Sequence, residues 1–264
     1  MDTASRSAPQ PARLSATVVL ARDGADGLEV LMITRNRQVD FAAGALVFPG
    51  GKASAADFDP AWQARAPGPF AEEERAARIA GLREVFEEVG LLLARKGDAA
   101  APPAACAPVV ARRAAIAPDD SAFGPVLEAE GLNLDIEALA PFAHWVTPKG
   151  MPKRFDTFFY AARAPEGQQA ACDGAEAADA VWVRPAEALA QARAGARTII
   201  FPTRLNLEWV AQHRDVDALL AAARARRIVR VEPEVVQEAE GLFLHIPAEA
   251  GYSVTREPLE GNRP

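Results

Sequence analysis

Four charged residues in one short stretch have the types and spacing needed to hold a divalent metal ion. They are Arg83, Glu84, Glu87 and Glu88, in the segment LREVFEEVGLL at residues 82–92. Mg²⁺ prefers oxygen ligands and is typically held by a few carboxylates together with water and substrate phosphates. A bound cation of this kind neutralises developing charge and generates hydroxide from water. The stretch therefore predicts a divalent-metal site built from carboxylates.

The element that must position these acids is a helix, which we expect over residues 72–89. Its acidic start suits the positive end of the helix dipole, and Gly90 is placed to end it. Helical periodicity then separates two faces. Glu84, Glu87 and Glu88 lie opposite an apolar stripe formed by Ile79, Leu82, Phe86, Val89 and Leu93.

A solvated acidic face is the ordinary alternative for such a helix. Against it, Glu84 and Glu88 repel each other at i,i+4, and Arg83 is the one local partner, placed to pair with Glu87. Side chains lean toward the helix N-terminus, so the acids are expected to lie over a row of small residues and an open pocket. That row is Ala77, Ala80 and Gly81. Gly81 costs about 1 kcal/mol relative to Ala, which close approach by a ligand or backbone would explain, as would drift.

The surrounding segments predict strands scattered among helices, which indicates a mixed α/β sheet packed between helices. Residues 52–71 are expected to be irregular and 97–108 an exposed connection, with short helices within 109–140. The strands are expected at 14–21 and 28–34 (a hairpin), 45–48, 142–147, 155–162, 180–183, 228–231 and 242–246, and further helices at 185–194, 203–213 and 216–226.

Composition excludes some classes of function. The net charge of −7 argues against a general nucleic-acid binder, which needs a basic patch. Residues 1–12 lack the apolar stretch of a secretory signal and are expected to form a flexible arm, and no apolar run is long enough to span a bilayer. Cys106 and Cys172 form no CxxC motif. A cytoplasmic protein is expected.

The acidic segment resembles the second half of the Nudix box, namely Arg-Glu, an apolar residue, Glu-Glu and Gly. Phe48-Pro49-Gly50-Gly51 resembles the turn that opens the box. The assignment of the first acid stays open. Asp57 has its normal distance from Gly51, whereas Glu74 lies one residue out of place relative to Arg83. Residues 58–75 are interpreted as an insertion in the box.

An insertion at this place resembles the Nudix branch that contains peroxisomal coenzyme A diphosphatases. HWVTP at 144–148, PKRFDTFFY at 152–160, Glu176 before the strand at 181–183, and the helix start at 201–203 resemble that branch as well. The resemblance covers residues 14–252. It implies one Nudix domain at 13–252, with a mixed sheet between helices, insertions at 58–75 and 95–140, a helical C-terminal part and a flexible tail at 253–264.

The resemblance also implies a site and a reaction. Glu84 and Glu88 would be the main ligands of Mg²⁺ or Mn²⁺, with Glu87 and the Gly51 carbonyl completing the shell. Either Glu84 or Glu88 would instead activate water, and Arg83 would orient the carboxylates. The substrate would be a small nucleoside diphosphate compound, foremost coenzyme A or acyl-coenzyme A, giving 3′,5′-ADP and (acyl-)phosphopantetheine.

Several further residues are substrate-binding candidates. Arg35 and Arg37 precede the FPGG turn and are placed to contact phosphates, although exposed loop arginines are more often merely solvated. The same two alternatives apply to Arg154 near the 142–162 hairpin. Glu176 is a candidate base or ligand. Two other functions stay open: a hydrolase of nucleoside diphosphate sugars or dinucleoside polyphosphates, and a non-catalytic ligand sensor. A homodimer is a further possibility.

Overall fold

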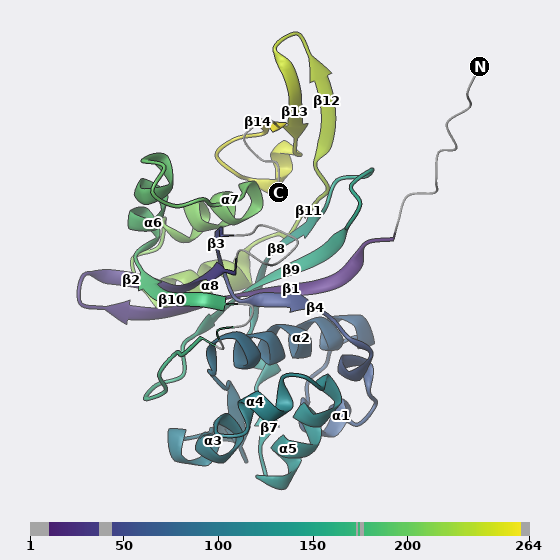
Figure 1. The fold of residues 1–264 in the computed structure, drawn as a ribbon, viewed down its shortest axis with the longest axis vertical. Coiled ribbons are helices and arrows are strands. Elements are labelled where there is room, and N and C mark those ends of the chain that lie inside the picture. The colour runs from purple at the N-terminus through teal and green to yellow at the C-terminus, as the bar shows by residue number, and fades with distance from the viewer. Residues whose placement is uncertain (1–10, 37–43, 173, 175–176, 260–264) are drawn as a thin grey trace.

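A mixed β-sheet divides the molecule into two layers (Figure 1). The computed structural model describes residues 11–36, 44–172, 174 and 177–259. The strands follow the order β10-β2-β1-β9-β8-β11, with β3 added to β2 and β4 to β1. Their bounds are β1 Arg13–Gly24, β2 Gly27–Arg35, β3 Leu46–Val47, β4 Gly50–Lys52, β8 Ala140–Val146, β9 Phe155–Arg163, β10 Ala177–Val183 and β11 Arg230–Val231.

Strand β1 lies at the centre of this sheet. It forms an antiparallel hairpin with β2 through the pair Gly24 and Gly27, and it runs parallel to β9, where Arg13 is the partner of Phe155. β11 also runs parallel to β8, whereas the remaining pairs of the sheet are antiparallel. The predicted mixed sheet is confirmed.

Helices cover both faces of the sheet, each over its own hydrophobic core. The long helix α2 (Glu72–Val89) packs on one face. Helices α6 (Pro185–Arg193), α7 (Phe201–Val210) and α8 (Val216–Ala225) pack on the other. The helices predicted at 72–89, 185–194, 203–213 and 216–226 are therefore confirmed, with ends shifted by no more than a few residues.

The two expected insertions fold together beneath α2. Residues 58–75 contain α1 (Trp62–Arg65), preceded by the 3-10 helix η1 (Ala55–Phe58), so the segment 52–71 is more regular than expected. The second insertion contains β5 (Ala94–Lys96), β6 (Ala99–Ala100), α3 (Pro103–Val110), α4 (Arg113–Ile116), η2 (Asp120–Ala122), α5 (Phe123–Ala129), β7 (Asn133–Leu134) and η3 (Ile136–Ala138).

The prediction of an exposed connection at 97–108 is wrong at its C-terminal end. Helix α3 begins at Pro103, where proline suits the first turn of a helix, and the following alanines favour helix. Cys106 and Val109 anchor it because both are buried in the core beneath α2.

The C-terminal part is helical only as far as α8, so the helical elaboration expected to residue 252 is wrong beyond it, whereas the strands expected at 228–231 and 242–246 are confirmed as β11 and β13. Strands β12 (Glu234–Glu238), β13 (Gly241–His245) and β14 (Arg256–Pro258) form a separate antiparallel sheet, with η4 (Ala248–Ala250) before β14. The hairpin β12–β13 projects from the body of the molecule (Figure 1). β12 was missed because acidic residues flank its two valines, and β14 lies inside the expected tail. No helix in the described ranges is long and apolar enough to cross a bilayer.

Candidate metal and substrate site

Helix α2 carries the acidic residues on one side and is buried on the other. Four residues of the expected apolar stripe, Ile79, Leu82, Phe86 and Val89, are each at most 1% exposed, whereas the fifth, Leu93, lies beyond the end of the helix. Gly90 ends the helix in the left-handed conformation, with φ 71°, and its N–H donates to the Phe86 carbonyl.

The insertions hold the buried side of α2 in place. The Phe86 ring stacks on Phe123 at a centroid distance of 5.1 Å, and Phe123 contacts Trp62 at 6.1 Å. Phe123 comes from the second insertion and Trp62 from the first. The helix that carries the acids is therefore wedged between the sheet and both insertions.

The expected open pocket over small residues is wrong. Ala77 and Ala80 are fully buried, and a Cβ on Gly81 would lie 3.0 Å from a Val18 methyl group and 3.2 Å from the Ala16 Cβ. These residues are small because α2 packs closely on β1. Close approach by another part of the chain, rather than by a ligand, explains Gly81.

Arg83 is the centre of the acidic cluster. Its guanidinium donates to both carboxylate oxygens of Asp57, each at 3.0 Å, and the two side chains are 3% and 1% exposed. The same guanidinium donates to Glu84 at 3.2 Å and to Glu87 at 3.0 Å. The predicted pairing of Arg83 with Glu87 is confirmed.

Asp57 is therefore the first acid of the cluster, and it acts on Arg83. Its second carboxylate oxygen also accepts the Ser54 N–H at 2.8 Å, which fixes the carboxylate in the turn that leads into η1. Glu74 instead pairs with Arg78 at 2.9 Å and is half-exposed. The question left open between Asp57 and Glu74 is settled by position: only Asp57 reaches Arg83.

The Gly50-Gly51 turn lies directly against the glutamates. The Gly50 N–H donates to the buried Glu88 carboxylate at 2.9 Å, and Gly50 has a φ of 154°, which favours glycine. A Cβ on Gly51 would lie 2.3 Å from the Glu84 carboxyl carbon. Two glycines are thus needed at this turn, one for its conformation and one to leave room for Glu84.

The pKa values of Glu87 and Arg83 are both shifted by burial and by their charged neighbours. Burial raises the pKa of Glu87 to about 8, against the opposing charge of Arg83. Burial alone would lower the pKa of Arg83, but the Asp57 hydrogen bond and the charges of Glu84, Asp57 and Glu87 raise it above its ordinary value. Repulsion among the acids is therefore offset in part by one shared guanidinium.

The donor set fits a divalent metal that recruits further ligands. The Glu87 Oε1 atom is buried without a hydrogen-bond partner in the described part of the chain, so a carboxylate oxygen is available. Glu84 lies directly against the Gly51 backbone. Across the described residues, no three or more His, Cys, Asp or Glu side chains are grouped so that they could hold a metal ion by themselves, so water or substrate oxygens would have to complete the shell. Oxygen donors of this kind suit Mg²⁺ or Mn²⁺, which keep water and substrate oxygens as ligands.

A cavity of about 650 Å³, here called the acidic cavity, opens in front of these groups. Its lining includes Gly51, Arg83, Glu84, Glu87 and Glu88. The second insertion adds Asp120, whose carboxylate lies 3.6 Å from Arg83. Sequence reasoning missed Asp120 because it lies in an insertion with no local signal beyond a pair of aspartates.

The substrate-binding candidates differ in their position relative to the acidic cavity. Arg35, at the end of β2, lines the acidic cavity, and its Nε atom is buried without a hydrogen-bond partner among the described residues. Arg154 instead pairs with Glu232 and donates to the Thr147 carbonyl at 3.1 Å, and it is not among the described residues that line the cavity. Arg37 and Glu176 lie outside the described residues.

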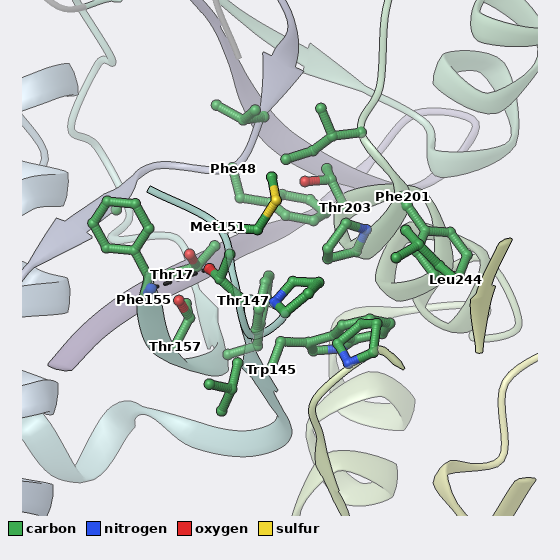
Figure 2. Close-up of a pocket in the computed structure, with 18 of the residues that line it drawn as sticks. Thr17, Phe48, Trp145, Thr147, Met151, Phe155, Thr157, Phe201, Thr203 and Leu244 are labelled. Carbon is green, nitrogen blue, oxygen red and sulfur yellow. Dashed lines mark hydrogen bonds between the residues drawn. The ribbon is translucent and has the colours of Figure 1, made fainter. Parts of the chain in front are cut away.

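A second cavity, here called the apolar cavity, has a volume of about 220 Å³ and adjoins the first. Figure 2 shows residues that line it. The two cavities share lining residues at their junction. Most of the remaining lining is hydrophobic and comes from segments far apart in sequence. The shared residues are Thr17, Arg35, Gly50, Phe155 and Thr157, and the hydrophobic lining includes Phe48, Trp145, Met151, Phe201, Leu244 and Leu259.

Hydrogen bonds fix one wall of the apolar cavity. The Trp145 indole N–H donates to the Tyr252 hydroxyl at 2.8 Å, and that hydroxyl donates to Asn206 at 2.7 Å. Phe201 packs edge-on against Trp145. Trp145 is only 4% exposed, and its indole lines this cavity.

Comparison with known protein families shows the family to which the chain belongs. The model of the NUDT19 Nudix domain matches residues 63–206, which is more than half of the chain and includes the acidic segment. The chain therefore belongs to the Nudix family.

The most informative relatives agree with this assignment. The acyl-coenzyme A diphosphatase NUDT19 of Gallus gallus is 32% identical over 213 residues, covering 61% of this chain and 55% of that protein. The human protein of the same name is 29% identical over 207 residues, covering 62% and 55%. The chain thus spans about half the length of these relatives.

A solved structure supports the fold. The NUDIX hydrolase from Alicyclobacillus acidocaldarius has a TM-score of 0.68 at 27% identity, covering 80% of this chain and 96% of that one. The predicted Nudix-like fold, with a mixed sheet between helices, is confirmed.

Proposed function

We propose that this chain is a divalent-metal-dependent Nudix hydrolase that cleaves the diphosphate linkage of coenzyme A or an acyl-coenzyme A. The products would be 3′,5′-ADP and phosphopantetheine or its acyl thioester. The observation that carries the proposal is the buried ion pair of Asp57 with Arg83, here called the Asp57 clamp. The guanidinium fixed in this way holds Glu84 and Glu87 at the wall of the acidic cavity. A sensor that only bound ligand would have little use for a buried carboxylate array of this kind.

The residues have distinct proposed roles. Glu84, Glu87, Glu88 and the Gly51 carbonyl would hold Mg²⁺ or Mn²⁺. The bound metal would neutralise the diphosphate oxygens and lower the pKa of an attacking water. Arg83 keeps Glu84 and Glu87 in position, and the Gly50 N–H does the same for Glu88. Either Glu84 or Glu88 would accept the proton of the water.

Arg35 is proposed to bind a substrate phosphate. Its buried Nε lacks a hydrogen-bond partner in the described chain, and the residue lies at the junction of the two cavities. A guanidinium matches phosphate oxygens in geometry and charge. The diphosphate would then lie between Arg35 and the glutamates.

The substrate class rests on the relatives and on the cavities together. The chicken and human relatives are named acyl-coenzyme A diphosphatases. The acidic cavity adjoins an apolar one, as expected for a substrate with a charged diphosphate and a less polar arm. The cytoplasmic location, the homodimer and the absence of nucleic-acid binding stay predictions.

The test is a substrate panel with Mg²⁺ and with Mn²⁺. Coenzyme A, octanoyl-coenzyme A, ADP-ribose, a nucleoside diphosphate sugar and a dinucleoside polyphosphate would be incubated with the protein, and products identified by mass spectrometry. We expect 3′,5′-ADP from the coenzyme A compounds. Faster turnover of the sugar or dinucleotide compounds would replace the proposed substrate, and no turnover of any compound would contradict the hydrolase itself.

A further inference from the structure

The apolar cavity opens directly beside the acidic cavity but holds none of the residues proposed to bind the metal. Of the described residues that line it, Arg35 is the single cationic one, and it lies at the junction. The deeper lining is aromatic and aliphatic, with Phe48, Trp145 and Met151 labelled in Figure 2. Such a surface favours an uncharged ligand group, because a buried charge without a partner is strongly disfavoured.

The C-terminal segment supplies part of the wall. Val235 of β12 and Leu244 of β13 are direct partners in the hairpin and therefore share one face, which lines the cavity. Pro233 and Leu259 extend this wall. Val235 is 44% exposed, so a ligand in the cavity would cover apolar surface there.

The size and the polar groups of the cavity restrict the class of ligand that it can bind. Its volume of about 220 Å³ exceeds that of the roughly 150 Å³ apolar cavity known to bind benzene. Thr17, Thr147 and Thr203 add hydroxyl groups to an otherwise apolar lining, which suits a chain with a few amide groups. Met151, from the β8–β9 loop, is a flexible side chain that adapts to irregular apolar groups.

From these features we propose that the apolar cavity receives the acyl end of the substrate, with the C-terminal hairpin as its outer wall. This inference rests on the proposed function. It fixes the direction of the substrate: the acyl-pantetheine arm passes Arg35 into the apolar cavity, and the nucleotide with its 3′-phosphate stays on the side of the acidic cavity. The chain would therefore favour acyl-coenzyme A over free coenzyme A.

The hairpin offers a matched pair of substitutions for the test. Val235 and Leu242 are both exposed hydrophobic residues of the hairpin, at 44% and 39%. Val235 lines the cavity, whereas Leu242 is not among its described lining residues. Val235→Asp would place a charge in the proposed acyl path, and Leu242→Asp would place one on the same hairpin away from it.

Binding would be measured by calorimetry in EDTA, where metal-dependent turnover cannot occur. We expect octanoyl-coenzyme A to bind the unaltered protein on the order of tenfold more tightly than coenzyme A, because apolar surface is buried. Val235→Asp should reduce this ratio by about fivefold or more, since small changes in apolar pockets alter specificity by such factors. Leu242→Asp should leave the ratio unchanged, and Met151→Glu should repeat the Val235→Asp result.

Two outcomes would overturn the inference. One is an octanoyl preference that Val235→Asp and Met151→Glu leave intact, or no preference at all. The other is an equal loss of affinity for adenosine 3′,5′-bisphosphate in Val235→Asp, which would place the nucleotide in this cavity. Turnover of coenzyme A by the unaltered protein with Mg²⁺ is measured alongside, so failure of the proposed function shows separately from failure of the acyl site.

Discussion

The acidic and apolar cavities share a junction but are held together by different forces. The acidic cavity depends on a few charged groups at fixed distances, with one guanidinium serving Asp57, Glu84 and Glu87. The apolar cavity depends on many weak contacts among residues from the N-terminal and the C-terminal halves of the chain. Single changes in the first should therefore affect every substrate, whereas changes in the second should affect the choice among substrates.

The largest expected effect comes from Glu88→Gln. We expect kcat/KM to fall by about 10²–10⁴-fold, and equally for coenzyme A and octanoyl-coenzyme A, because a metal ligand or base is lost. Steady-state kinetics with Mg²⁺ measures this. Glu73→Gln, an exposed change in the first turn of the same helix, serves as control. Turnover by Glu88→Gln at the normal rate would contradict the assignment of the acidic cavity as the catalytic site.

Asp57→Ala should mainly reduce stability. Removing one partner of a buried ion pair costs about 3–5 kcal/mol, and both Asp57 and Arg83 are almost fully buried. Urea unfolding monitored by circular dichroism would give the change in unfolding free energy. The exposed change Asp98→Ala should cost less than about 0.5 kcal/mol. A similarly small cost for Asp57→Ala would mean that Arg83 does not need its clamp.

Gly51→Ala tests the space in front of Glu84. The new Cβ would lie 2.3 Å from the Glu84 carboxyl carbon, so the carboxylate must move. A displacement of about 1 Å in a catalytic group costs on the order of 10²-fold in rate. We expect kcat to fall while the ratio between the two coenzyme A substrates stays constant. A changed ratio would show that the two cavities are not independent.

Arg35→Gln should have the smallest effect, because it removes one charged contact at the junction. We expect KM to rise by about tenfold for both substrates, as is typical for the loss of a hydrogen bond to a charged group. The comparison with Arg95→Gln, on the distant strand β5, controls for net charge. If only the octanoyl substrate were affected, Arg35 would belong to the apolar cavity rather than to the diphosphate.

The same contrast explains what could be predicted from the sequence. Arg83, Glu84, Glu87 and Glu88 occur within one helix, so periodicity alone places them on one face opposite the buried stripe. The identity of the first acid could only be narrowed to two candidates, Asp57 and Glu74. The reason is that the insertion separates Asp57 from Arg83 by 26 positions. The open pocket expected over Ala77, Ala80 and Gly81 was wrong because small residues permit close packing as readily as they leave space.

The apolar cavity could not be predicted in this way. Its lining residues, such as Phe48, Met151 and Leu244, lie far apart in the sequence and share no motif, and only the fold brings them together. The hairpin that forms its wall was missed in part because β12 is rich in acidic residues. Periodicity reports on one element at a time, whereas this cavity is a property of several elements at once.

The parallel pairing of β1 with β9 has a consequence for synthesis of the chain. Arg13 and Phe155 are partners, so one side of the central strand must wait for about 140 further residues, or roughly 7–28 s of translation at 5–20 residues per second. During that interval β1 has its hairpin partner β2, but the edge meant for β9 is open to other strands. The insertions lengthen this wait, so the segments that brace the catalytic helix also delay completion of the sheet beneath it.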